Sequence, residues 1–94
     1  MEYLKELWNV VKDRVEKPKD GSYTSSLVAK GVPYVARKFG EESIELIVAS
    51  LSEDKKRVIE EAADVIYHLM VLLAAKGVDF EDVVKELESR ARHR

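Results

Sequence analysis

The chain has 94 residues, which is enough for one small domain, and we expect residues 1–94 to form that domain. Its net charge of −2 gives no basic footprint for nucleic acid, and the absence of cysteine excludes disulfides, thiolate catalysis and cysteine-bound zinc. A chain without cysteine fits a cytoplasmic protein. The longest nearly apolar run, residues 65–75, is too short to cross a bilayer, so no membrane role is expected.

The first predicted helix covers residues 3–15, where apolar side chains recur at helical spacing. Trp8 is expected to anchor this helix in the core or in an interface. Pro18 ends the helix, because the residue before a proline avoids the α conformation. The apolar stripe consists of Tyr3, Leu4, Leu7, Trp8, Val11 and Val15.

A loop rich in turn residues is predicted at residues 17–26, and a short helix that reaches Lys30 follows it. Thr24 or Ser25 is expected to cap that helix. A helix N-terminus beside lysines can hold an anion, but an ordinary capped surface loop explains the same residues. The glycine and lysine pattern of a Walker phosphate loop is absent.

Two long helices are predicted at residues 34–51 and 54–76, joined by a polar turn at residues 52–54. Pro33 suits the first turn of the former helix. Gly40 inside that helix costs about 1 kcal/mol relative to alanine, so it either admits a close neighbour or ligand, or marks a bend.

The last predicted helix follows Gly77, a typical helix end, and begins at the capping residue Asp79. No segment alternates like a strand, so the chain is expected to be all-α, with four to five helices. Because 46% of so short a chain is hydrophobic, we expect a partner subunit to cover part of its apolar surface.

The two long helices each carry one short acidic stripe on an otherwise largely apolar surface. Glu42 and Glu45 lie one turn apart on the first helix, and Glu61 and Asp64 lie one turn apart on the second. A helix that is apolar nearly all round is buried, so these carboxylates are not expected to form an ordinary solvated face.

The register of the hairpin brings the two stripes level. Glu45 and Glu61 are each eight residues from Glu53 in the turn, and Glu42 and Asp64 are each eleven. All four carboxylates then lie roughly 12–17 Å from the turn, at 1.5 Å per residue. Four clustered carboxylates repel one another and lose solvation, which protonation or a cation must offset. Oxygen ligands alone favour Mg²⁺, with Mn²⁺ as the second choice.

Other interpretations of these residues stay open. A di-iron carboxylate bundle is disfavoured, because neither His68 nor His93 follows a glutamate by three positions. His68 lies one turn beyond Asp64 and is either a core histidine or a hydrogen-bond partner of Asp64. Lys38, one turn before Glu42, either balances charge or holds a phosphate.

The spacing E-E-x-x-E followed by E-x-x-D resembles the all-α nucleotide pyrophosphohydrolases of the MazG type. Three flanking segments are similar to the phosphoribosyl-ATP pyrophosphatase family of histidine biosynthesis, so that the resemblance covers nearly the whole chain. These segments read P-K-D-G-S-Y-T-x-x-L, K-F-G-E-E-S-I-E and E-E-A-A-D-V-I-Y-H-L-x-V-L-L-A.

This resemblance implies a MazG-like helical bundle that is completed by dimerisation. The expected protein is therefore a homodimer, and the cytoplasm is its expected location. It also implies hydrolysis of the α–β phosphoanhydride of 1-(5-phosphoribosyl)-ATP, which gives 1-(5-phosphoribosyl)-AMP and pyrophosphate in the second step of L-histidine biosynthesis. Carried over by position, the Mg²⁺ ligands are Glu42, Glu45, Glu61 and Asp64. Glu41 is the implied group that activates water, with Glu42 or Glu45 as alternatives.

The resemblance also implies substrate contacts. Phosphates are assigned to Lys30, Arg37 and Lys38, and the phosphoribosyl end to Ser22, Tyr23 and Thr24. Two rival functions remain open: a house-cleaning pyrophosphohydrolase for ordinary or damaged (d)NTPs, against which residues 21–27 argue, and a helical dimerisation module whose acids are structural.

Overall fold

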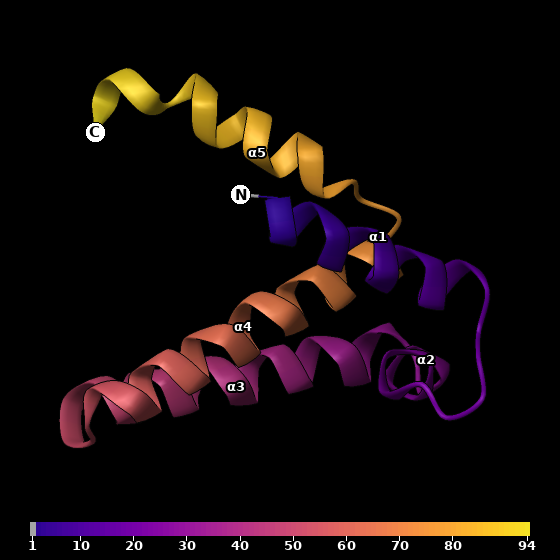
Figure 1. Cartoon of the computed structure of the whole chain (residues 1–94), viewed down its shortest axis with the longest axis horizontal. Helices are drawn as coiled ribbons and strands as arrows, with labels where there is room; N and C mark the ends of the chain where they lie inside the picture. The colour runs from indigo at the N-terminus through magenta and orange to yellow at the C-terminus, as the bar shows by residue number, and fades with distance from the viewer. Residues whose placement is uncertain (1) are drawn as a thin grey trace.

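The computed structural model describes residues 2–94 and is helical along most of that length (Figure 1). No strand occurs within these residues, which confirms the expected all-α class. None of the helices in this range combines the length and hydropathy that a membrane span requires. The helices are α1 (Glu2–Glu16), α2 (Tyr23–Ala29), α3 (Val32–Ser52), α4 (Lys55–Ala75) and α5 (Phe80–Ser89), followed by a 3-10 turn at Ala91–His93.

The core lies where α1 and α2 pack against one end of the α3–α4 hairpin. Trp8 is 7% exposed and its ring lies 5.8 Å from that of Phe80, which confirms the predicted anchor. Tyr3 is 67% exposed, so its predicted place in the buried apolar stripe is wrong, whereas Leu4 in the same turn of α1 packs against the core. The core consists of Trp8, Val11, Leu27, Val35, Met70 and Val71.

The turn between α3 and α4 forms where the sequence predicts it. The backbone N–H of Glu53 donates to the Ala49 carbonyl at 3.0 Å and ends α3. Asp54 is the N-cap of α4, and its carboxylate accepts from the Arg57 backbone N–H at 3.1 Å. This short connection makes α3 and α4 antiparallel, and they lie close together near the turn and diverge towards α1 and α2 (Figure 1).

The cap of α2 differs from the expected one. Ser22, and neither Thr24 nor Ser25, is the N-cap, and its hydroxyl accepts from the Ser25 backbone N–H at 3.1 Å. Gly21, at a φ of 84°, turns the chain so that Ser22 can adopt the extended conformation of a cap. The Ser25 hydroxyl instead donates to the Arg14 carbonyl at 2.8 Å and ties α2 to α1.

The half of the hairpin near its turn projects beyond the other helices (Figure 1). The radius of gyration is 14.3 Å, compared with about 12 Å for a compact domain of this length. Large apolar side chains on this projecting part are exposed in the single chain, so the predicted burial of the two apolar helices is incomplete there. They are Ile44, Ile47, Val48, Leu51, Ile59 and Ile66, which we call the hairpin face.

Two glycines give opposite predictions for stability. A Cβ at Gly40 would meet no atom within 4 Å, so Gly40→Ala is expected to raise the free energy of unfolding by about 1 kcal/mol. Urea unfolding at one fixed protein concentration measures this change. A loss of stability in Gly40→Ala would contradict the open space at this position.

Gly77 has a φ of 72° where α4 ends, so Gly77→Ala is expected to lower the free energy of unfolding by about 1–2 kcal/mol. The same urea unfolding experiment measures this loss.

Candidate metal centre

Three of the four predicted ligands meet between α3 and α4. Glu42, Glu45 and Glu61 each offer one carboxylate oxygen, and these oxygens all lie within 4.8 Å of one another. Glu42 and Glu61 are 8% and 3% exposed, whereas Glu45 is exposed. The predicted register is therefore confirmed for Glu45 and Glu61, and we call the three residues the carboxylate cluster.

The environment of Glu42 favours the protonated carboxyl. Burial raises the pKa of Glu42 above its ordinary value of 4.5, and the charge of Glu45 raises it further. His68 and Lys38 oppose that rise in the pKa through their positive charge, but they do not cancel it. A cation beside Glu42 would oppose this rise in the pKa by favouring the charged carboxylate.

Glu61 carries the clearest sign that the cluster lacks a partner. Burial and then the charge of Glu45 raise the pKa of Glu61, while Arg57 lowers it. One oxygen of Glu61, Oε2, is fully buried and has no hydrogen-bond partner in the described chain. A buried carboxylate oxygen without a partner is costly, because it has lost its water and gained nothing in return.

Asp64, the fourth predicted ligand, contributes no oxygen to the carboxylate cluster. The negative charge of Asp64 still raises the pKa of Glu61, so Asp64 lies near Glu61. The Asp64 backbone carbonyl pairs with Nδ1 of His68 at 2.7 Å, and His68 is 4% exposed. His68 is therefore a buried core histidine that bonds the backbone of Asp64.

Glu41 lies outside the carboxylate cluster, and its carboxylate is close to two cations. The Glu41 carboxylate lies 3.8 Å from Arg37 Nε and 3.9 Å from Lys38 Nζ. These are helix pairs at i, i+4 and i, i+3 spacing, and half-exposed pairs of this kind contribute little to stability. They bring Arg37 and Lys38, two of the three predicted phosphate-binding cations, to the flank of the cluster.

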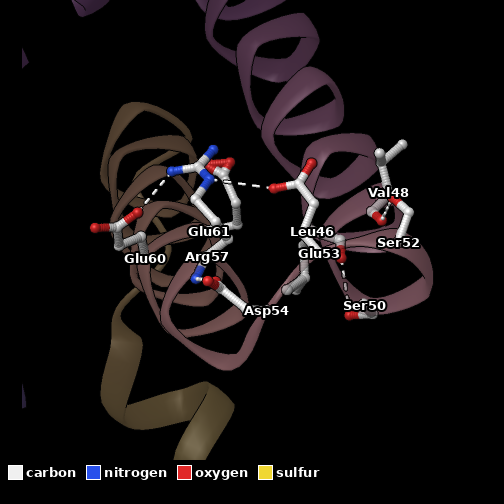
Figure 2. Close-up of polar contacts among 9 residues, drawn as sticks. All are labelled: Leu46, Val48, Ser50, Ser52, Glu53, Asp54, Arg57, Glu60 and Glu61. Atoms are coloured by element: carbon white, nitrogen blue, oxygen red, sulfur yellow. Dashed lines mark hydrogen bonds and ion pairs between the residues drawn. The ribbon is translucent and has the colours of Figure 1, made fainter.

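Arg57 is a cation beside the cluster that the sequence analysis missed. Its guanidinium donates to Glu53 at 3.2 Å and to Glu60 at 2.6 Å, and it lies 3.7 Å from Glu61 (Figure 2). The three acids are four before, three after and four after Arg57 in the sequence, a spacing that on its own is typical of a solvated helix surface. Arg57 differs from an ordinary surface cation only because its neighbour Glu61 belongs to the carboxylate cluster.

The hydroxyl residues of the loop hold α2 against α4. Thr24 is 6% exposed and its hydroxyl bonds that of Tyr67, whose pKa is raised by burial. The Tyr23 hydroxyl lies 3.5 Å from Nε2 of His68, while the Tyr23 side chain stays 52% exposed. Thr24 and Ser22 are thus engaged within the fold, and Tyr23 is the member of this group that presents a surface.

Lys30 and Arg37 lie over one aromatic ring. Lys30 Nζ is 4.6 Å and the Arg37 guanidinium carbon is 5.1 Å from the centre of the Tyr34 ring. Cation–π contacts of this kind hold long side chains in place at exposed sites. Tyr34, which the sequence analysis did not select, therefore positions two of the three predicted phosphate-binding residues.

The carboxylate cluster fits a divalent cation. Its donor atoms are all carboxylate oxygens, the set that Mg²⁺ and Mn²⁺ prefer. The buried unpartnered oxygen of Glu61 and the raised pKa values of Glu42 and Glu61 are both costs that a cation would relieve. Next to this centre, fixed guanidinium and ammonium groups are suited to phosphates.

Comparisons with known proteins agree with one another. A family model described as phosphoribosyl-ATP pyrophosphohydrolase matches residues 4–91. The phosphoribosyl-ATP pyrophosphatase of Ignicoccus hospitalis is 64% identical over 91 residues, which cover 97% of this chain and 89% of that protein. A protein of the same name from Saccharolobus solfataricus is 57% identical over 91 residues, which cover 97% of each chain. The corresponding protein from Saccharolobus islandicus is 55% identical over the same share.

The raised pKa of Glu61 predicts how stability depends on pH without metal. Between the unfolded value of 4.5 and the raised pKa, the folded chain keeps a proton that the unfolded chain has released. The free energy of unfolding therefore falls as pH rises through that interval, and below pH 4.5 the effect vanishes.

Glu61→Gln removes this titration. In EDTA at pH 7 the thermal midpoint of the variant is expected to exceed that of the original chain, and the difference should shrink towards pH 4. Glu88→Gln, at an exposed position on α5, is the matched control and should leave the midpoint unchanged. An equal gain in both variants, or a gain that persists at low pH, would contradict the raised pKa.

Proposed function

The chain belongs to the phosphoribosyl-ATP pyrophosphohydrolase family, and we infer from this membership that it hydrolyses phosphoribosyl-ATP to phosphoribosyl-AMP and pyrophosphate. That reaction is the second step of histidine biosynthesis, and it breaks the α–β phosphoanhydride. The observation that carries the inference is the match along almost the whole chain together with a carboxylate cluster that fits a divalent cation. We further propose that the enzyme works in the cytoplasm, which a chain without cysteine fits.

We propose that Glu42, Glu45 and Glu61 hold Mg²⁺, with Asp64 one turn further along α4 as the fourth ligand. When bound, Mg²⁺ supplies neutralisation of the phosphate charge. Support comes from the buried oxygen of Glu61, which lacks a partner, and from the burial that raises the pKa of Glu42.

The proposed catalytic group is Glu41, which orients the attacking water and accepts its proton. Glu41 neighbours the cluster without joining it, and its carboxylate lies near Arg37 and Lys38. A carboxylate at hydrogen-bond distance from a water can act as a general base. Glu42 and Glu45, the alternatives, are engaged in the cluster itself.

The substrate contacts follow from what the fold leaves accessible. Lys38 lies beside Glu41, and its charge lowers the pKa of Glu42, so we propose that it binds a phosphate. Lys30 and Arg37 are proposed to bind further phosphates near Tyr34. The exposed ring of Tyr23 is proposed to contact the phosphoribosyl end directly. Ser22 and Thr24 contribute to the same contact by holding α2 in place.

We propose that the chain works as a homodimer joined through the hairpin face. Leu51, Ile59 and Ile44 on this face are 83%, 68% and 61% exposed in the single chain. An exposed apolar patch formed by neighbouring residues on two packed helices marks an interaction surface, since monomers rarely leave one uncovered. Covering it with a second copy would complete the helical bundle.

The reaction is tested by pyrophosphate release from phosphoribosyl-ATP, ATP and dCTP, each with Mg²⁺ and with EDTA. We expect release from phosphoribosyl-ATP that EDTA abolishes. Glu61→Gln is expected to lose more than about 100-fold in turnover, because even residues that only support a metal ligand cost 10–100-fold. Glu88→Gln should retain turnover, and circular dichroism should show that both variants are folded. Release mainly from ATP or dCTP would instead support the house-cleaning function.

The homodimer is tested by light scattering coupled to gel filtration. The original chain is expected to show twice the 10.7 kDa of one chain. Leu51→Glu should reduce the mass to that of one chain, because it places a charge in the proposed interface. Leu87→Glu, at a 52% exposed position on α5, is the control and should stay dimeric. A monomeric original chain, or dissociation by Leu87→Glu alone, would refute this interface.

A further inference from the structure

Arg57 is held in one orientation at the start of α4. Its Nε donates to Glu53 at 3.2 Å, and its Nη1 donates to Glu60 at 2.6 Å. Figure 2 shows the guanidinium between these two carboxylates, one in the turn and one on the next turn of α4. Two charge-assisted hydrogen bonds from opposite sides fix the plane of the guanidinium.

The remaining donors of this guanidinium are unused. Nη2 makes no hydrogen bond within residues 2–94, and its nearest acid is Glu61 Oε1 at 3.7 Å, which is beyond hydrogen-bond distance. An arginine carries five N–H donors, so both N–H groups of Nη2 are available for a ligand. They lie on the side of the guanidinium that faces the carboxylate cluster.

A cavity lies where these donors and the cluster meet. Its volume is about 140 Å³, several times the share of about 30 Å³ that one water takes in the liquid. Glu45 and Glu61 contribute to its lining from the cluster, Arg57 from the start of α4, and Ile44 and Val48 form an apolar wall. The space therefore has cluster oxygens on one side and a fixed guanidinium on the other.

The charges determine what this cavity can bind. Glu45, Glu61 and Glu53 around it outnumber Arg57, so an anion is repelled while the cluster holds no cation. A divalent cation on the cluster cancels that excess of negative charge. An anion with several oxygens could then contact the cation with one oxygen and Arg57 Nη2 with another, and phosphate matches the guanidinium in this way.

We propose that Arg57 binds the pyrophosphate portion of the substrate, and the pyrophosphate product, in this cavity once a divalent cation holds the cluster. This inference rests on the proposed function, which makes phosphoribosyl-ATP the substrate. It adds a fourth cation to Lys30, Arg37 and Lys38, which lie towards the other end of the cluster around Tyr34 and Glu41. The proposed phosphate-binding cations then lie near both ends of the carboxylate cluster.

The test compares Arg57→Gln and Arg57→Lys with Arg90→Gln. Arg90 pairs with Glu86 at 2.8 Å on α5 by the same i, i+4 geometry and is the matched control. Calorimetry measures the affinity for inorganic pyrophosphate with Mg²⁺, and separately the affinity for Mn²⁺ alone. Steady-state kinetics with phosphoribosyl-ATP give KM and kcat.

Arg57→Gln is expected to weaken pyrophosphate binding by about 10- to 100-fold, the loss typical of a hydrogen bond to a charged group. KM should rise in parallel. Arg57→Lys keeps the charge without the planar fork and should fall in between. Mn²⁺ affinity should not fall in either variant, because Arg57 is not a proposed ligand and removing its positive charge beside Glu61 lessens the repulsion of a cation. Arg90→Gln should match the original chain in every measurement.

Unchanged pyrophosphate affinity in Arg57→Gln would overturn the inference. So would a change confined to Mn²⁺ affinity, because Arg57 would then act only as a neighbour of Glu61. These failures differ from failure of the proposed function. If the original chain releases no pyrophosphate from phosphoribosyl-ATP, the reaction is wrong, whereas loss of pyrophosphate binding in Arg57→Gln would still support the site.

Discussion

The packing of α3 on α4 forces three carboxylates into one small space, and the rest of the chain is arranged around that constraint. At the far end of the hairpin, Val35, Met70 and Val71 are completely buried and fix how the two helices sit. That apolar contact holds Glu42 and Glu61 together against their repulsion and their loss of water. Protonation or a bound cation would offset this cost, and the carboxylate oxygens of the cluster are the donor set that suits a divalent cation.

The parts that the sequence predicts well depend on helical periodicity. Counting residues from Glu53 places Glu45 and Glu61 at the same height, because the rise per residue of a helix is constant. The same count places Asp64 level with Glu42, yet Asp64 stays outside the cluster. Height along a helix does not fix the direction of a side chain, which depends on how two packed helices are rotated and crossed.

The parts that the sequence does not predict depend on partners far apart along the chain. Ser25 looks like a cap by its local sequence, but its hydroxyl bonds the Arg14 carbonyl, so Ser22 takes the cap. Thr24 finds its partner in Tyr67, 43 residues away. Arg57 reads as an ordinary surface cation until the fold brings Glu61 into the cluster beside it. In each case the residue type is visible in the sequence, and its role is set by tertiary contact.

The hairpin face and the carboxylate cluster are continuous, and this links the proposed dimer to the proposed metal. Ile44 and Val48 belong to the face and also line the cavity that Glu45 and Glu61 share with Arg57. A second copy on the face would remove water from beside these charges. If the cluster holds no cation, removing this water strengthens the repulsion among its carboxylates. If the cluster holds a cation, removing the water strengthens the attraction between the cation and the carboxylates. Any such difference is reciprocal, so a cation that favours the dimer is bound more tightly by the dimer than by the single chain.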